Sequence, residues 1–133
     1  MQHYNFEYAA VPPTYGAYSH AVEAGDFVFV AGQLARDADT GELVAGDIGE
    51  QTICALKIVG TILSELGLAY RHIVRATVYL ADISDFEAMN AAYRSLMPEP
   101  FPARSTPQVK LPLGARVGIE VTAFRPRPSG ATS

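Results

Sequence analysis

Residues 47–80, DIGEQTICALKIVGTILSELGLAYRHIVRATVYL, decide the fold, because the spacing of their apolar side chains changes within one continuous stretch. From Asp47 to Leu66 the apolar residues recur at steps of three and four, which is the spacing of one face of an α-helix. Asp47 is the expected N-cap, and Glu50 is placed to complete a capping box. Gly67 is the expected stop.

The stretch from Ile73 to Leu80 alternates instead, so that every second residue lies on the same side of the chain. This alternation predicts a β-strand. The expected apolar face carries Val74, Ala76, Val78 and Leu80, and the other face carries Arg75, Thr77 and Tyr79. A helix and a strand that follows it closely are thus the centre of the expected fold.

Patterns on either side of this stretch extend the fold. Residues 26–31, DFVFVA, lie between two glycines and are apolar on both faces, which predicts a strand buried on both sides. Ser84-Asp85-Phe86-Glu87 matches a capping box that opens a helix ending near Met97. The proline-rich residues 98–102 exclude a helix or a central strand. Two further strands are predicted, a short one over Ala103–Val109 that Pro107 limits, and a last one over Val117–Phe124.

The elements follow one another as β, α, β, α, β and β, with room for one short extra strand at the front. One sheet with both helices on one face, an α+β fold, accommodates this order. The other face would carry Val28 or Phe29, Tyr79 and Phe124, and so apolar a face usually marks an oligomer interface. A single domain over residues 1–133 is expected, with an irregular N-terminus over about residues 1–15 and a loose tail over about residues 126–133.

Composition excludes several kinds of partner. Lysine and arginine number 10 against 14 aspartate and glutamate, a net charge of −4, and the basic residues are scattered, so no nucleic-acid partner is expected. No apolar run is long enough to span a membrane, and the N-terminus lacks the pattern of a signal peptide. The single cysteine, Cys54, cannot form an internal disulfide, which favours an intracellular, cytoplasmic location.

Motifs for metal or nucleotide chemistry are absent from the sequence. The three histidines, His3, His20 and His72, lie far apart and lack the spacing of metal ligands, so no metal is expected. The glycines form neither a P-loop nor a dinucleotide fingerprint, and there is no nucleophile elbow. Without the resemblance described next, the sequence predicts only an α+β domain that is expected to be oligomeric.

Seven segments, taken together and in order, resemble the RidA/YjgF family. The most specific of them is Phe101-Pro102-Ala103-Arg104-Ser105, and together they cover roughly residues 14–125. The others are Gly16–Ala21 (GAYSHA), Val30–Leu34 (VAGQL), Thr40–Glu42 followed by Glu50-Gln51, Val78–Asp82 (VYLAD), Phe86–Tyr93 (FEAMNAAY) and Ile119–Ala123 (IEVTA).

The resemblance implies a chorismate-mutase-like fold, assembled as a homotrimer whose sheets line an inner barrel and whose substrate clefts lie between subunits. It implies hydrolytic deamination of short enamine and imine acids of the 2-aminoacrylate type to 2-keto acids and ammonia. The expected ligand is a small carboxylate, and no cofactor is expected.

Arg104 and Glu120 are the expected catalytic residues. A small substrate with one carboxylate needs a permanently charged, bidentate partner, and the guanidinium group of Arg104 has that geometry. Glu120 alternates with the apolar residues of the last strand, so it points away from their face. The resemblance implies that Glu120 holds or activates the attacking water, as a general base.

The resemblance also implies a set of substrate-binding positions. Tyr18 and Asn90 match family positions at the cleft, and Gly32 would allow the backbone to approach the ligand closely. Ala31 stands where many members have serine or threonine, and Thr106 stands where they often have cysteine. These two departures put the identity of the substrate in question more than the existence of the site.

Three functions remain open from the sequence. The leading one is deamination of short enamine or imine acids. The second is a pathway-specific enzyme of the same type, such as a deaminase of an aminomuconate-like acid or a tailoring enzyme of secondary metabolism, which Ala31 and Thr106 favour. The third is a trimeric ligand-binding protein without turnover, against which the presence of both Arg104 and Glu120 argues.

Overall fold

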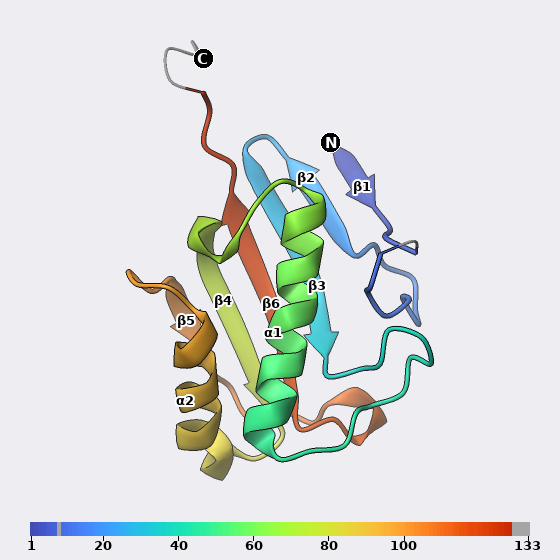
Figure 1. The fold of residues 1–133 in the computed structure, drawn as a ribbon, viewed down its shortest axis with the longest axis vertical. Coiled ribbons are helices and arrows are strands. Elements are labelled where there is room, and N and C mark those ends of the chain that lie inside the picture. The colour runs from blue at the N-terminus through green and yellow to red at the C-terminus, as the bar shows by residue number, and fades with distance from the viewer. Residues whose placement is uncertain (8, 129–133) are drawn as a thin grey trace.

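Six strands form one mixed sheet in the computed structural model, which describes residues 1–7 and 9–128 (Figure 1). Their order across the sheet is β1-β2-β3-β6-β4-β5, and neighbours are antiparallel except for the parallel pair of β4 and β5. The strands are β1 (Gln2–Tyr4), β2 (Ala21–Ala24), β3 (Phe27–Leu34), β4 (Ile73–Leu80), β5 (Ala103–Ser105) and β6 (Val117–Phe124).

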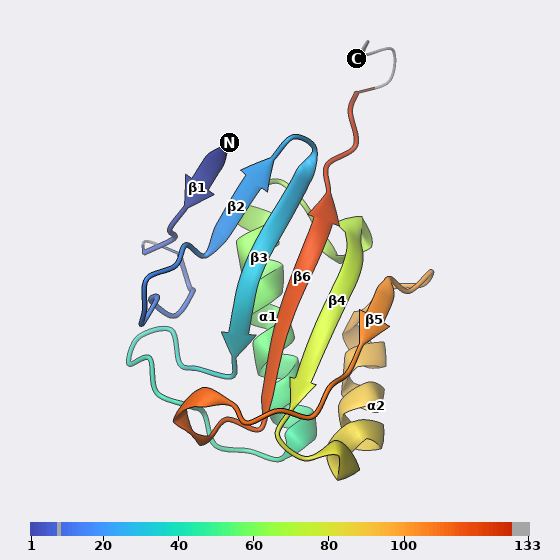
Figure 2. The ribbon, with the colours of Figure 1, turned by 180° about the vertical axis from the view of Figure 1, so that it is seen from behind.

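Both α-helices, α1 (Ile48–Glu65) and α2 (Phe86–Leu96), lie on the same face of this sheet. Figure 2 shows the opposite face, which no helix covers. Three 3-10 turns complete the elements: η1 (Tyr70–His72), η2 (Ile83–Asp85) and η3 (Pro112–Gly114). The predicted α+β fold with two helices on one face is confirmed. The core fills the space between α1 and the sheet and includes Val28, Leu56, Val59, Ile62, Leu63, Val78, Leu80, Val117 and Ile119.

Local signals place the ends of α1 as predicted. The side chain of Asp47 accepts a hydrogen bond from the backbone N–H of Glu50 (2.8 Å), and the Glu50 carboxylate accepts one from the N–H of Asp47 (3.3 Å). Past the C-terminus, Gly67 has a φ of 73°, a conformation that glycine adopts without steric cost. The helix therefore begins and ends where short-range chemistry directs it.

The start of α2 differs from the prediction. No capping box forms, because the helix begins at Phe86 and its N-cap, Asp85, makes no side-chain capping hydrogen bond. Ser84 instead donates its backbone N–H (2.9 Å) and its hydroxyl (2.7 Å) to the carboxylate of Asp82. Asp82 thus caps the short turn η2, which leads into α2.

One residue of β4 departs from the predicted alternation. The register between β4 and β6 shifts between Ile73 and Arg75, so Val74 is 44% exposed where the sequence placed it on the apolar face. Such a bulge turns one side chain outward without ending the strand. Beyond it the prediction holds, since Ala76, Val78 and Leu80 are fully buried.

The first third of the chain contains more sheet than predicted. Residues 2–4, expected to be irregular, form β1 and pair with β2. The expectation that residues 26–31 are buried on both sides is wrong for the single chain, because Phe27 and Phe29 are 43% and 47% exposed on the uncovered face. The strand also runs further than predicted, to Leu34.

The short strand after the proline-rich segment ends earlier than predicted. β5 covers Ala103–Ser105, and beyond it one isolated bridge joins Gln108 to Leu80. β5 forms one edge of the sheet and is paired with β4. Of the predicted loose tail, residues 126–128 have no regular structure, and residues 129–133 lie outside the described part of the chain.

Candidate functional site

Arg104 is the middle residue of the edge strand β5. It lies in register with Ala76, a fully buried residue, so its half-buried side chain projects toward the helices. The guanidinium carbon lies 4.7 Å from the ring centre of Tyr93 and 5.5 Å from that of Phe86, both on α2. Two aromatic faces therefore hold the charged group in place at the edge of the sheet.

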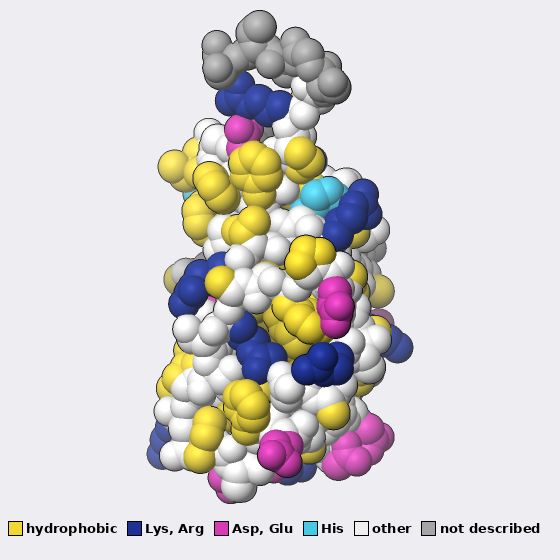
Figure 3. All heavy atoms as spheres, turned by 90° about the vertical axis from the view of Figure 1, so that its left-hand side faces the viewer, with side chains coloured by type: hydrophobic (Ala, Val, Ile, Leu, Met, Phe, Trp, Pro, Cys, Tyr) yellow, Lys and Arg dark blue, Asp and Glu magenta, His cyan; other side chains and the backbone are white. Residues whose placement is uncertain are grey.

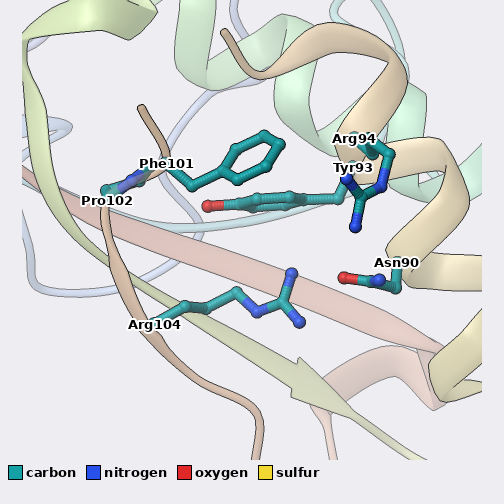
Figure 4. A pocket seen from close by; sticks show the side chains of 6 residues that line it. All are labelled: Asn90, Tyr93, Arg94, Phe101, Pro102 and Arg104. Carbon is teal, nitrogen blue, oxygen red and sulfur yellow. The ribbon is translucent and has the colours of Figure 1, made fainter. Parts of the chain in front are cut away.

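A cavity of about 250 Å³ opens beside this guanidinium group (Figure 4). Asn90 and Arg94 project from α2 toward the same space as Arg104, and the ring of Tyr93 lies above the guanidinium group of Arg104. Figure 3 shows the side of the molecule that carries α2 and β5, where basic side chains flank a hollow with hydrophobic side chains in it. The cavity is lined by Asn90, Tyr93, Arg94, Phe101, Pro102 and Arg104.

None of the residues that line this cavity is acidic. Arg104 takes part in none of the three ion pairs found among the described residues, which are Arg116–Asp85, Arg125–Glu23 and Arg127–Asp26. A half-buried cation with no carboxylate beside it favours the binding of an anion from outside the chain.

Tyr93 has a further property that points to an outside partner. The residue is 3% exposed, and its buried hydroxyl has no hydrogen-bond partner within the described residues. Burial raises the pKa of this hydroxyl, and the positive charge of Arg104 opposes the rise. A buried hydroxyl without a partner is costly, so a group from a ligand or from a second copy of the chain is expected beside it.

Glu120 lies in β6 and faces the uncovered side of the sheet, opposite Thr77 in register. The hydroxyl of Tyr79 donates a hydrogen bond of 2.5 Å to its Oε1 atom. This hydrogen bond, together with burial and the negative charge of Glu120, raises the pKa of Tyr79. Glu120 also lines a second cavity of about 190 Å³, with Phe29, Val30, Arg75, Thr77, Val121 and Thr122.

Within one chain the two expected catalytic residues lie on opposite faces of the sheet. Arg104 shares the face of Ala76 with the helices, whereas Glu120 shares the uncovered face with Thr77 and Tyr79. They line separate cavities. One substrate of a few atoms cannot reach both groups in a single copy of this chain.

The other predicted site residues do not all lie in one place either. Asn90 lies with Arg104, whereas Ala31 and Gly32 lie in β3, at a bulge where neither has a register partner on β6. Gly32 is exposed, and a Cβ atom there would meet nothing within 4 Å. Tyr18 lies in the loop before β2, and its hydroxyl accepts a hydrogen bond from the N–H of Tyr15 at 3.4 Å.

Thr106 is half-buried directly after β5, two residues from Arg104, and it lines none of the cavities described above.

Several neighbours of Arg104 and Glu120 were not predicted from the sequence. Phe86, Tyr93 and Arg94 lie three or four residues from Asn90, which was predicted, so all four share one side of a helix, and this signal was available in the sequence. The hydrogen bond from Tyr79 to Glu120 joins neighbouring strands, and such pairs depend on a register that one sequence does not reveal.

No group of three or more histidine, cysteine, aspartate or glutamate side chains is arranged to hold a metal ion in residues 1–7 and 9–128. No helix in the same residues combines the length and the apolarity that crossing a membrane requires.

Comparison with known proteins places this architecture in a family. Residues 9–125 match the family model described as endoribonuclease L-PSP. A RutC family protein of Pyrococcus abyssi is 41% identical over 115 residues, which cover 86% of this chain and 91% of that protein. Human 2-iminobutanoate/2-iminopropanoate deaminase is 39% identical over 118 residues, 88% of this chain and 86% of the human protein.

Solved structures agree with the sequence comparison. The crystal structure of RidA from the Antarctic bacterium Psychrobacter sp. PAMC 21119 matches with a TM-score of 0.87 and 33% identity over 93% of this chain and 99% of that one. The chain therefore belongs to the endoribonuclease L-PSP family, which includes the RidA/YjgF proteins that the sequence resembles. The prediction of an enzyme is confirmed at the level of the family, since the curated relatives include deaminases.

Proposed function

We propose that this chain hydrolyses short 2-imino acids, and their enamine tautomers, to 2-keto acids and ammonia. The observation that carries the proposal is Arg104, a half-buried guanidinium group stacked on two aromatic rings and facing a cavity with no acidic lining residue. The names of relatives at about 40% identity, 2-iminobutanoate/2-iminopropanoate deaminases, supply the reaction.

The carboxylate of the imino acid is the group that Arg104 would bind. A guanidinium group offers two parallel N–H donors to the two oxygens of a carboxylate, which fixes the orientation of a small ligand as well as its position. The amide of Asn90 lies across the same cavity and is available to hydrogen-bond the imine nitrogen or the carboxylate. Both Arg104 and Asn90 are thus proposed as substrate-binding residues.

The hydrolysis itself needs water and a proton acceptor. A water oxygen bonds to the carbon of the C=N group as a base removes the water proton, and the nitrogen is protonated. The nitrogen takes up a second proton and the C–N bond breaks, so ammonia leaves, and loss of the hydroxyl proton leaves a C=O group. A carboxylate positioned near the water is suited to move these protons. Glu120, held through one oxygen by Tyr79, is proposed for that role.

The opposite orientations of Arg104 and Glu120 require a second copy of the chain in this proposal. The edge strand β5 brings Arg104 of one copy to a cleft, and the uncovered face of the next copy brings Glu120, Ala31 and Gly32 to the same cleft. Each copy would then offer both surfaces, an arrangement that closes into a ring. A homotrimer, which the family resemblance implies, satisfies this condition.

Two exposed features of the single chain support such an assembly. Phe27, Phe29 and Phe124 are between 37% and 47% exposed on the uncovered face, and the rings of Phe27 and Phe124 lie 5.5 Å apart. The bare backbone at Gly32 leaves room for the neighbouring copy or the substrate to approach. Tyr18 and Thr106 are proposed as further contacts at the rim of the cleft.

Ammonia release tests the proposed reaction directly. A threonine dehydratase and threonine generate 2-aminocrotonate and its imine, which hydrolyse slowly without a catalyst, and addition of this protein should raise the early rate of ammonia formation. A variant with Arg104→Ala is the control, and it should leave the uncatalysed rate unchanged. Binding of 2-oxobutanoate with no increase in ammonia release would contradict the proposal and favour a ligand-binding protein without turnover.

A further inference from the structure

Arg94 is a second cation at the cavity of Arg104. It lies one residue after Tyr93 on α2, and its guanidinium carbon is 5.3 Å from the ring centre of Phe101. Figure 4 shows the guanidinium groups of Arg94 and Arg104 projecting into the same space from α2 and from β5. An aromatic ring lies within cation–π distance of each group, which favours these positions of the two positive charges.

No ion pair among the described residues neutralises the charge of these two arginines, since neither belongs to any of the three pairs. The lining contains no acidic side chain, and Asn90 adds an uncharged polar group beside the cations. Two like charges at one cavity repel each other unless an anion enters. A ligand with one carboxylate satisfies Arg104 and leaves Arg94 without an anionic partner.

We propose that the cavity takes substrates with two carboxylates, namely the imines of 2-keto dicarboxylic acids. Arg104 binds the carboxylate next to the imine carbon, and Arg94 binds the distal carboxylate. This inference rests on the proposed deaminase function and narrows its substrate class. Arg94 acts as a specificity-determining residue, and it takes no part in the chemical step.

The test compares two ligands that differ in the second carboxylate. Binding of 2-oxoglutarate and of 2-oxobutanoate is measured by calorimetry for the wild-type protein, for Arg94→Gln and for Arg94→Glu. We expect the wild-type protein to prefer 2-oxoglutarate. Because Arg94 is exposed, its loss in Arg94→Gln should reduce the preference about fivefold, near the upper end for a solvent-exposed charge pair. Arg94→Glu should reduce it further, and added salt should weaken the wild-type preference.

Arg71→Gln is the matched control, because Arg71 is an exposed arginine on η1 that does not line the cavity. It removes the same charge and should leave the preference for 2-oxoglutarate unchanged. The same comparison is made for turnover, using imines that an amino-acid oxidase generates from glutamate or from 2-aminobutanoate. Circular dichroism and light scattering on each variant verify that fold and assembly are kept.

The outcomes separate this inference from the function on which it rests. Deamination of the monocarboxylate imine, with no preference for 2-oxoglutarate in the wild-type protein, would overturn the role of Arg94 and keep the proposed function. An equal loss of preference in Arg94→Gln and Arg71→Gln would also overturn it, because net charge would then explain the effect. Failure to deaminate either imine would contradict the proposed function itself.

Discussion

Arg104 gains its proposed chemistry from its surroundings and from its position in the edge strand. The rings of Tyr93 and Phe86 lie beside the guanidinium group and reduce its contact with water, which strengthens its attraction for a carboxylate.

Arg104→Lys tests whether this geometry, and not the charge alone, binds the substrate. Lysine keeps the charge but replaces the planar fork with a compact ammonium group. Truncating one partner of a buried charge pair costs about 2–5 kcal/mol, and a 1 Å misplacement of the reacting carbon costs on the order of a hundredfold in rate. We expect weak binding of 2-keto acids and a loss of deaminase activity of about a hundredfold or more. Arg71→Lys is the control, and activity near wild type in Arg104→Lys would refute the bidentate contact.

Glu120→Gln tests the proposed base. The glutamine side chain still presents an oxygen to the hydroxyl of Tyr79, so the local hydrogen bond is kept, but the side chain no longer accepts a proton. We expect kcat to fall by about a hundredfold or more, with little change in the affinity for 2-keto acids. The pKa of Tyr79 should fall toward its ordinary value, because its hydrogen bond to a carboxylate is the main cause of the rise. Turnover at the wild-type rate would remove Glu120 from the mechanism.

Elements whose ends are set by short-range chemistry could be predicted from the sequence. The capping box at Asp47 and the turn at Gly67 fix α1, and alternation fixes β4 and β6. β1 could not be predicted in this way, since three residues carry no clear period and the strand exists because β2 lies beside it.

The candidate site, like the fold, could be predicted from the sequence only in part. Residue types and the family resemblance point to Arg104 and Glu120, and the alternation of β6 gives the direction of Glu120 within its strand. That the two residues face opposite sides of the sheet follows from the registers of β4 with β5 and with β6. Those registers are set by contacts between residues far apart in the chain. No local pattern in a single sequence reveals such contacts.

An ion pair joins elements on either side of β3. Glu23 of β2 accepts a hydrogen bond of 2.6 Å from Nε of Arg125, which follows β6. This hydrogen bond holds the pKa of Glu23 below its usual range, against the effect of burial. A carboxyl group with a lowered pKa in the folded state stabilises the fold above its unfolded-state pKa, and the stabilisation is lost as the pH falls through the lowered value.

Glu23→Gln should therefore lower the free energy of unfolding by about 0.5–1 kcal/mol near neutral pH, given that Arg125 is partly exposed and screened by water. The difference from the wild-type protein should vanish in acid, below the folded-state pKa of Glu23. Urea unfolding at several pH values measures it. Glu65→Gln, an exposed carboxylate outside the three ion pairs, is the control. A difference that stayed constant down to the lowest pH would contradict an electrostatic origin.

The whole molecule, as a single chain, leaves one face of its sheet uncovered (Figure 2). Phe27 and Phe29 are nearly half exposed there, and the proposed site is incomplete without a neighbour. We expect light scattering to give three times the 14.3 kDa of one chain at micromolar concentration. Phe29→Glu should place a charge in the interface and shift the protein toward the monomer, with loss of activity. An active monomer would rule out a site shared between copies.

Complementation between two inactive variants tests the central claim, a deaminase site built from Arg104 of one copy and Glu120 of the next. Arg104→Ala and Glu120→Gln are co-expressed with different tags, and oligomers that carry both tags are purified. Each variant alone should be inactive, whereas the purified mixed trimers should regain roughly a third of the sites, because an intact Arg104 and an intact Glu120 then meet at one of the three interfaces of every mixed trimer. Ammonia release near that level is the predicted result, and mixed oligomers no more active than the separate variants would contradict the shared site.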